Sequence, residues 1–281
     1  MRILYVTDIH GIEWKHTQIL QLASSLKPDM VINGGDMLPF TGNLLHQDKF
    51  ITGFLDDYFS KFESIGIYYL GFLGNDDLGI FDDLFQTICD KYSLVVNMAQ
   101  NRFQLVGSNY EFIGMNWVSD LPFGLKDRAR KDTEDFEFPK QIGKQYLSIP
   151  DGFKRLDDWF SYAETLPTIE DEIRNLVKPS DMSNTIYIFH NPPANLELDV
   201  VFDGRRVGSK AEYNFLKKNQ PKLSLHGHIH ESPDVSGRWF SKLGETICIQ
   251  PGQFRQDQDF LIYVIIDLDT MNIERKIVTK T

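Results

Sequence analysis

Short apolar runs alternate with amphipathic stretches along the first third of the chain. In Asp48–Ser64 the large apolar residues recur at steps of three and four positions, which is the helical period. Gly66 follows this stretch, as is typical of the residue after a helix. The alternation of strands and helices is typical of parallel βαβ units. We predict strands at Arg2–Thr7, Asp29–Asn33 and Ile67–Phe72, and helices at Thr17–Leu26, Asp48–Ser64 and Ile80–Lys91.

Core-like patterning returns near the start of the last third. A helix is predicted at Lys210–Lys218, because Ser209 and Glu212 have the spacing of a capping box and Pro221 follows the helix end. Apolar runs predict strands at Thr185–Phe189 and Lys222–Leu225. The remaining runs predict a closing series of antiparallel strands at Thr246–Ile249, Phe260–Leu268 and Ile273–Val278.

The middle of the chain, Ser119–Ser183, differs from both flanks, because it is rich in Asp, Glu, Lys and Pro. Helical patches are predicted at Leu156–Leu166 and Ile169–Val177. This pattern is compatible with a lid, a cap or a solvated excursion. We therefore expect one domain over residues 1–281 with a lid or insertion at about 119–183.

Charge and composition narrow the class of protein. The 281 residues include 29 basic and 40 acidic ones, a net charge of −11, which disfavours non-specific nucleic-acid binding. Two cysteines, Cys89 and Cys248, indicate no disulfide framework or thiolate metal site. The N-terminus enters an apolar strand pattern at once, and the apolar runs are far shorter than the roughly 20 residues of a membrane span. We expect a cytoplasmic protein that does not bind membranes.

Five of the predicted strands are each followed by residues that can bind a metal ion. In α/β sheets, ligands bind at the carboxyl ends of the strands, so these residues should gather in one place. Asp–x–His and His–x–His spacing projects two side chains to the same side of an extended segment. Five of the seven histidines belong to this group. Its members are Asp8 and His10, Asp36, the run Asn75–Asp77, His190, and His226, His228 and His230.

Carboxylates and imidazoles gathered at a sheet end would leave buried charge unpaired unless a cation lay among them. The sequence therefore predicts a metal site. Imidazole, carboxylate and amide ligands together suit Mn, Fe, Zn, Co or Ni better than Mg or Ca.

The same residues resemble the motifs of the calcineurin-like metallophosphoesterase superfamily and follow the same order. The matching segments are Asp8-Ile9-His10, Gly35-Asp36, Gly74-Asn75, His190 and Gly227-His228-Ile229-His230. A closer resemblance is to a poorly characterised subgroup of predicted phosphoesterases. It rests on Pro122-Phe123-Gly124, His190-Asn191-Pro192-Pro193, Gly204–Ser209, His226–Ser232 and Pro251-Gly252. The resemblance implies an α/β fold, a four-layer αββα sandwich of two mixed β-sheets flanked by helices.

The resemblance further implies two divalent metal ions at the junction of the two sheets. One would be held by Asp8, His10, Asp36 and His230, and the other by Asp36, Asn75, His190 and His228, with Asp36 as the bridge. Two ions roughly 3.5–4 Å apart lower the pKa of a shared water and clamp the attacking and leaving oxygens. The implied activity is hydrolysis of phosphate esters by a metal-bridging hydroxide, with phosphodiesters favoured over monoesters.

One position departs from the superfamily pattern. Most members place a histidine after Gly-Asn, where it is thought to contact the phosphate and assist the leaving group, whereas this chain has Asp76. An aspartate repels phosphate when ionised and donates a proton only when its pKa is raised. Asp76 and His226 are the candidate catalytic residues, His226 as a side chain that orients the histidine ligands. Glu231 is a further candidate for that orienting role.

We expect a small phosphate ester as the substrate, with nucleotides among the options. Basic residues that could hold a phosphate are Arg205 and Arg206, or Arg128, Arg130 and Lys131, although charge runs more often form a solvated face. Two alternatives share the fold: a non-catalytic protein-interaction scaffold and a nuclease. The complete ligand set argues against the scaffold, and the acidic composition argues against the nuclease.

Overall fold

Both faces of the central strands are apolar, which places them between two layers of structure. In the computed structural model, which describes residues 1–254 and 259–280, β1 (Arg2–Val6) directs Ile3 and Tyr5 to one side and Leu4 and Val6 to the other. Ile3 and Tyr5 join a core between two sheets, and Leu4 and Val6 join a second core beneath helices. Burial on both faces is typical of parallel strands in α/β folds.

The first sheet has the order β16-β15-β1-β2-β3-β4. β1 to β4 are parallel, and β15 pairs antiparallel with β1 and with β16. Three helices cover the outer face, and their apolar sides meet the sheet in one cluster that includes Ile19, Phe59 and Phe85. The strand bounds are β2 (Met30–Asn33), β3 (Tyr68–Gly71), β4 (Val95–Asn97), β15 (Phe260–Asp267) and β16 (Asn272–Thr279); the helices are α1 (Glu13–Leu26), α3 (Asp56–Ile65) and α4 (Asp82–Cys89).

The second sheet has the order β13-β14-β12-β11-β6-β5. Its inner face supplies Phe112, Ile186 and Leu223 to the core between the sheets. Its outer face packs against α6 (Ile169–Asn175) and α7 (Lys210–Asn219). The strands are β5 (Arg102–Gln104), β6 (Glu111–Met115), β11 (Thr185–Phe189), β12 (Leu223–Leu225), β13 (Phe240–Leu243) and β14 (Thr246–Ile249).

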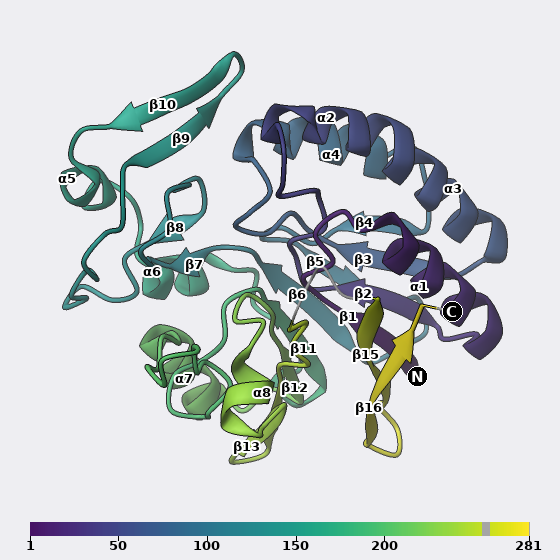
Figure 1. Ribbon diagram of the computed structural model, residues 1–281. Helices are drawn as coiled ribbons and strands as arrows, with labels where there is room; N and C mark the ends of the chain where they lie inside the picture. The colour runs from purple at the N-terminus through teal and green to yellow at the C-terminus, as the bar shows by residue number, and fades with distance from the viewer. Residues whose placement is uncertain (255–258, 281) are drawn as a thin grey trace.

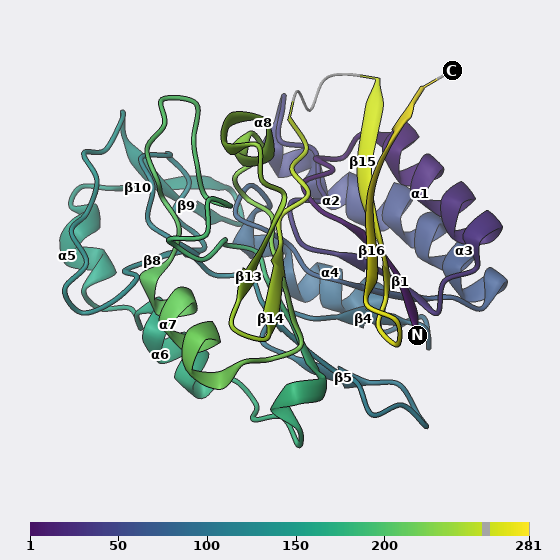
Figure 2. The same ribbon diagram turned by 90° about the horizontal axis from the view of Figure 1, so that it is seen from below.

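The layers run helix, sheet, sheet, helix, with α1, α3 and α4 on one side and α6 and α7 on the other (Figure 1; Figure 2). This arrangement confirms the predicted four-layer αββα sandwich of two mixed sheets. The shorter elements are η1 (Leu44–His46), α2 (Gln47–Lys49), the π-helical η2 (Phe50–Leu55), η3 (Gly79–Phe81), η4 (Met182–Asn184) and α8 (Ser232–Ser236). Of these, α2 and η2 run directly into α3.

Two predictions near the C-terminal end need correction. The closing strands do not form one antiparallel run, because β14 lies in the second sheet and pairs parallel with β12, while β15 and β16 complete the first sheet. The capping box at α7 is only half formed: the Ser209 hydroxyl accepts a hydrogen bond from the Glu212 amide, but the Glu212 carboxylate is buried. Apolar periodicity reveals burial, but not strand direction or sheet membership.

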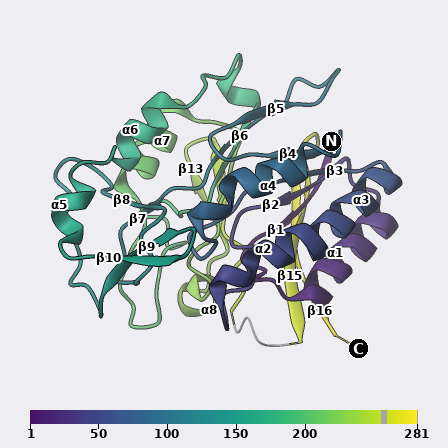
Figure 3. The same ribbon diagram turned by 90° about the horizontal axis from the view of Figure 1, so that it is seen from above.

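The middle segment builds a small core of its own. It contains β7 (Val118–Ser119), β8 (Ala129–Arg130), a hairpin of β9 (Gln145–Ile149) and β10 (Gly152–Leu156), and α5 (Trp159–Ala163). Ala129, Leu156 and Trp159 pack together there, whereas α6 packs on the second sheet. The predicted helix at Leu156–Leu166 is thus a strand end followed by one short helix. The hairpin lies on the far side of the molecule from both termini (Figure 3).

None of the helices in the described ranges is long and apolar enough to cross a membrane.

Candidate metal centre

The loops after β1 and β2 bend sharply, and these bends bring the first ligand candidates together. Asp8, His10 and Asp36 have positive φ angles of 57°, 50° and 51°, a conformation that side chains other than glycine rarely adopt and that is often found at functional sites. Backbone hydrogen bonds extend beyond the strands, because the Asp8 amide donates to the Gly35 carbonyl (3.0 Å) and the His10 amide to the Asp36 carbonyl (2.8 Å). The two loops therefore run side by side.

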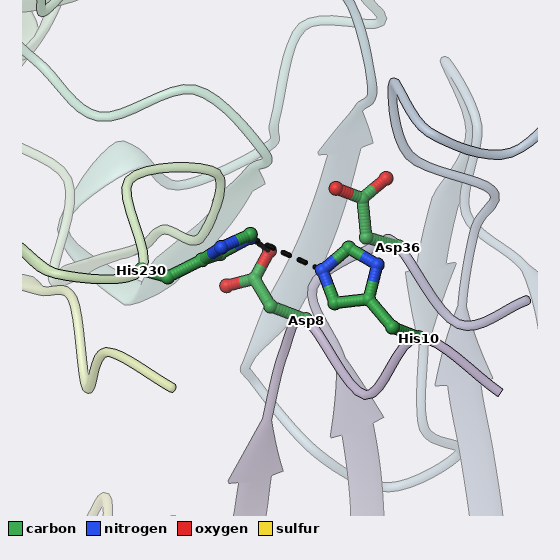
Figure 4. Close-up of side chains that lie close together, drawn as sticks. All are labelled: Asp8, His10, Asp36 and His230. Atoms are coloured by element: carbon green, nitrogen blue, oxygen red, sulfur yellow. Dashed lines mark hydrogen bonds and ion pairs between the residues drawn. The ribbon is translucent and has the colours of Figure 1, made fainter. Parts of the chain in front are cut away.

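Four side chains converge on one point. One donor atom from each of Asp8, His10, Asp36 and His230 lies within 4.8 Å of all the others. Figure 4 shows them approaching from the ends of β1 and β2 and from the loop after β12. The Nε2 atoms of His10 and His230 are 3.1 Å apart, and His230 Nε2 is 3.5 Å from Asp8 Oδ1. Two nitrogens bound to one ion at about 2.1 Å lie roughly 3 Å apart, so this spacing suits a shared metal ion.

A second group of donors adjoins the first through Asp36. His190 Nε2 lies 2.9 Å from Asn75 Oδ1 and 3.3 Å from Asp36 Oδ2. His190 Nδ1 donates to the Gly34 carbonyl at 2.7 Å, which leaves Nε2 to face the other two residues. The His228 ring follows at a centroid distance of 5.4 Å from the His190 ring. Asp36, Asn75 and His190 of the second predicted set thus lie in contact, and the His228 ring lies beside that of His190.

Two glycines permit this close approach. A Cβ atom at Gly74 would lie 2.2 Å from Asp36 Oδ1, and one at Gly227 would lie 2.1 Å from Thr7 Oγ1 and 2.9 Å from Asp8 Oδ2. Any side chain at these positions would displace the carboxylates. Glycine is required there because the backbone passes directly beside the site.

Several buried donor atoms of the site have no hydrogen-bond partner within residues 1–254 and 259–280. They are Asp8 Oδ2, Asp36 Oδ2 and His228 Nε2. A buried polar atom without a partner costs free energy, and a buried carboxylate oxygen costs more. A cation among these atoms would satisfy them, so the residues present fit a site for divalent metal ions.

Burial and neighbouring charges set the pKa values of the donor side chains. Burial lowers the pKa of His190, but the carboxylates of Asp36 and Asp8 and the Gly34 carbonyl outweigh burial and raise it to about 9. Burial similarly opposes ionisation of Asp36, but the His190 charge holds the pKa of that carboxyl well below its usual range. Burial lowers the pKa of His10 to about 4 and that of His228 to about 3. The latter two imidazoles stay neutral, as metal binding requires.

Asp76 lies at the rim of the site. Its amide donates to Asp36 Oδ1 at 2.9 Å, and its Oδ2 lies 3.8 Å from His10 Nδ1. The side chain is 35% exposed, so it can face a substrate. Loss of water contact and the neighbouring Asp36 charge raise the pKa of Asp76 to about 7 in the metal-free site, and bound dications would act in the opposite direction.

The remaining candidates have hydrogen-bond or ion-pair partners other than the predicted ligand side chains. His226 is buried, and its Nδ1 donates to the Asn191 carbonyl at 2.8 Å rather than to a predicted ligand. Glu231 accepts from the Phe202 amide at 3.3 Å. The basic candidates engage protein carboxylates, and their pairs are Arg128–Asp82, Arg130–Glu172, Lys131–Glu164, Arg205–Asp203 and Arg206–Glu197.

Three further residues shape the site, and of these the sequence analysis gave only Asp77 a possible role, as one of the residues able to bind a metal ion. Asp77 is fully buried and accepts hydrogen bonds from the amides of Gly74, Met37 and Leu38, so it fastens the loops after β2 and β3 together. Two aromatic rings flank the ligands: Phe40 lies 4.6 Å from His10 and Phe123 lies 6.0 Å from His228, centroid to centroid. The motif Pro122-Phe123-Gly124 was the only feature of the sequence that pointed to Phe123. No feature of the sequence pointed to Phe40.

Comparison with known proteins identifies the class. The family model for calcineurin-like phosphoesterases matches residues 1–232, so the chain belongs to that family. Membership supports a hydrolase that acts on phosphate esters and uses divalent metal ions.

Solved structures show the same fold at low sequence identity. One is 16% identical over 98% of both chains with a TM-score of 0.61. The protein TT1561 of Thermus thermophilus is 14% identical over 98% of this chain and 97% of its own, with a TM-score of 0.56. Among curated proteins, none matches this sequence.

Proposed function

We propose that this protein hydrolyses phosphate esters at a binuclear metal centre and prefers phosphodiesters to phosphomonoesters. The observation that supports the proposal most is the position of Asp36. Its carboxylate belongs to the cluster of Asp8, His10 and His230 and also lies 3.3 Å from His190 Nε2. One side chain thus adjoins two sets of donors, as a bridging ligand must.

The proposed ligand sets are those implied by the family motifs: Asp8, His10, Asp36 and His230 for one ion, and Asp36, Asn75, His190 and His228 for the other. The bound pair of ions would activate water and neutralise phosphate charge. The protein orients the donors. The Gly34 carbonyl fixes the His190 ring, and the Asp8 carboxylate is held by the backbone amide of His228, which donates to it at 3.0 Å. Mn, Fe, Zn, Co and Ni all suit these ligands.

The preference for diesters follows from charge at the rim. A phosphomonoester carries a charge near −2 at neutral pH, whereas a phosphodiester carries −1. Asp76 is partly exposed beside the ligands, and when ionised it repels the dianion more strongly than the monoanion. The substrate we propose is a small phosphodiester, with nucleotides among the candidates.

The test combines metal analysis with turnover. Purified protein should contain close to two divalent ions per chain and should hydrolyse bis-p-nitrophenyl phosphate faster than p-nitrophenyl phosphate. A chelator should abolish both rates, and added metal should restore them. Full metal content without turnover of either ester would instead indicate a scaffold. Faster cleavage of oligonucleotides than of cyclic nucleotides, dinucleotides and small esters would indicate a nuclease.

A further inference from the structure

An apolar cleft of about 270 Å³ lies between the loop after β2 and the β9–β10 hairpin. Leu44 forms the wall on the side of the first sheet. Gly124 and Leu125 line it from the middle segment, and Tyr146 and Phe153 line it from the two hairpin strands. The lining contains no charged side chain, which is unusual for a surface cleft in such an acidic protein. The cleft therefore suits an apolar part of a ligand better than a charged part.

Two phenylalanines that pack beside the predicted ligands belong to the same chain segments as cleft residues. Phe123, whose ring is perpendicular to that of His228 at 6.0 Å, directly precedes the cleft residues Gly124 and Leu125. Phe40, which lies 4.6 Å from His10, precedes Leu44 in the loop after β2. The Phe40 side chain is 39% exposed. An apolar group on a phosphate at the metal centre would thus meet aromatic surface beside the ligands.

Hydrogen bonds fix the cleft walls. The Tyr146 amide donates to the Gly124 carbonyl, and the Lys126 amide donates to the Tyr146 carbonyl, both at 2.8 Å. The Asp127 carboxylate accepts the Gly79 amide at 2.8 Å and the Ser148 amide at 2.8 Å. These bonds hold the hairpin against the loop that contains Asn75 and Asp76, so the cleft is formed without a ligand.

Two buried cations in the segment that lines the cleft are occupied within the protein. Lys126 binds Asp120 and Gln141 at 2.6 and 2.7 Å, and its ammonium lies 4.6 Å from the centre of the Phe123 ring. Arg128 is buried and pairs with Asp82. These two side chains are therefore not free to bind a second phosphate.

We propose that this cleft binds the apolar organic group of the substrate, so that the substrate class is phosphodiesters with an aryl or alkyl group. The inference rests on the proposed function and specifies the ester that the site would accept. Water adds to phosphorus, the bond from phosphorus to the leaving oxygen breaks, and the products are an alcohol and a phosphomonoester.

The test uses methyl-, butyl- and phenylphosphonate, because each has one organic group that cannot be hydrolysed. Calorimetric titration of the metal-loaded protein should give Kd values that fall about tenfold from methyl to phenyl, as expected for burial of the larger apolar group. Phe153→Ser and Leu44→Ser, on opposite walls, should each remove this gain while leaving the Kd for methylphosphonate unchanged. Phe240→Ser is the matched control, since Phe240 is 49% and Phe153 41% exposed, but Phe240 lies outside the cleft.

The outcomes separate this inference from the proposed function. Equal Kd values for the three phosphonates, or a phenyl gain that survives in both cleft variants, would overturn the inference even if bis-p-nitrophenyl phosphate is hydrolysed. Absence of turnover with intact phosphonate binding and an intact phenyl gain would overturn the proposed function and leave the cleft assignment standing. Melting curves and metal content should match those of the wild type for all variants, because the three side chains lie outside the buried core.

Discussion

At the scale of single residues, Asp36 is the side chain that the two proposed sets of metal ligands share. We expect Asp36→Ala to reduce the metal content from about two ions to fewer than one per chain, because both proposed ions lose the same carboxylate. Turnover should fall by more than about 100-fold, since even residues that only orient metal ligands contribute about 10–100-fold. Elemental analysis of the purified variant measures the first effect, and hydrolysis of bis-p-nitrophenyl phosphate measures the second.

The matched control is Asp157→Ala, because the Asp157 side chain is 96% exposed and pairs only loosely with Arg155 at 3.9 Å. This control should keep its full metal content and turnover. If Asp36→Ala also kept both ions, Asp36 would not bridge them.

Asp76 is the residue that we expect to influence which leaving groups the site can release. Two dications within about 4–5 Å should lower its pKa, so that it is ionised in the metal-loaded protein and cannot protonate a leaving alkoxide. Turnover should therefore favour nitrophenol esters over alkyl esters. Asp76→His should restore a proton donor and raise the rates of alkyl esters more than those of nitrophenyl esters, within the roughly 10²–10⁴-fold range of general acids.

The measurement is a plot of log kcat against leaving-group pKa for wild type and Asp76→His. The variant should show the shallower slope. Parallel lines would show that Asp76 does not affect the leaving group, and loss of activity in the variant would show that the aspartate has a positive role.

At the scale of elements, the Asp127 carboxylate supports the attachment of the β9–β10 hairpin in addition to the backbone hydrogen bonds of Tyr146. Asp127 accepts hydrogen bonds from the Gly79 amide and from the amide and hydroxyl of Ser148. Asp127→Ala leaves these donors without their acceptor, at roughly 1–3 kcal/mol for a buried group. Amide hydrogen exchange over residues 145–156 should therefore accelerate at least tenfold, while metal content stays unchanged.

Asp151→Ala serves as the control, because Asp151 is exposed at the turn of the same hairpin. Exchange in this variant should match the wild type. Equal exchange in Asp127→Ala and wild type would show that the other contacts are enough to hold the hairpin.

At the scale of the whole molecule, pH and metal binding should be linked. The pKa of His190 is raised to about 9 in the metal-free site. Burial lowers the pKa of His230, but the Asp8 charge raises it above its usual value. The His190 imidazole holds a proton at neutral pH and must lose it to bind metal, and the raised pKa of His230 acts in the same direction. The apparent affinity should therefore rise with pH, about tenfold per unit for each proton released, until it levels off above pH 9 or so.

Calorimetric titration with metal in two buffers of different ionisation enthalpy gives the number of protons released on metal binding. We expect at least one released proton per chain at pH 7. His10 and His228, with pKa values of about 4 and 3, contribute none at that pH. Replacement of the exposed His46 with alanine should leave the count unchanged. A count of zero would contradict the protonation of His190.

Many of the helices and strands could be predicted from the spacing of apolar residues along the chain. The strand at Thr185–Phe189 was predicted with its observed bounds, and the helix at Lys210–Lys218 lacked only its last residue. Elements with weak local patterns were not predicted, among them the short edge strands β5 and β13 and the β9–β10 hairpin. The residues of this hairpin are mostly half-exposed or exposed. They pack against the turn after β3, and a local pattern does not record such a contact.

The sequence by itself determined the family and the residues that gather at the strand ends, because ligand type, spacing and chain order are local properties. Tertiary structure decided the rest. Asp8 and His230 are 222 positions apart, and only the packing of two sheets places them 3.5 Å from each other. It also decided that Lys126 and Arg128 form ion pairs with Asp120 and Asp82, and that the Phe123 ring packs beside that of His228. Such contacts depend on how distant elements pack, which no short stretch of sequence specifies.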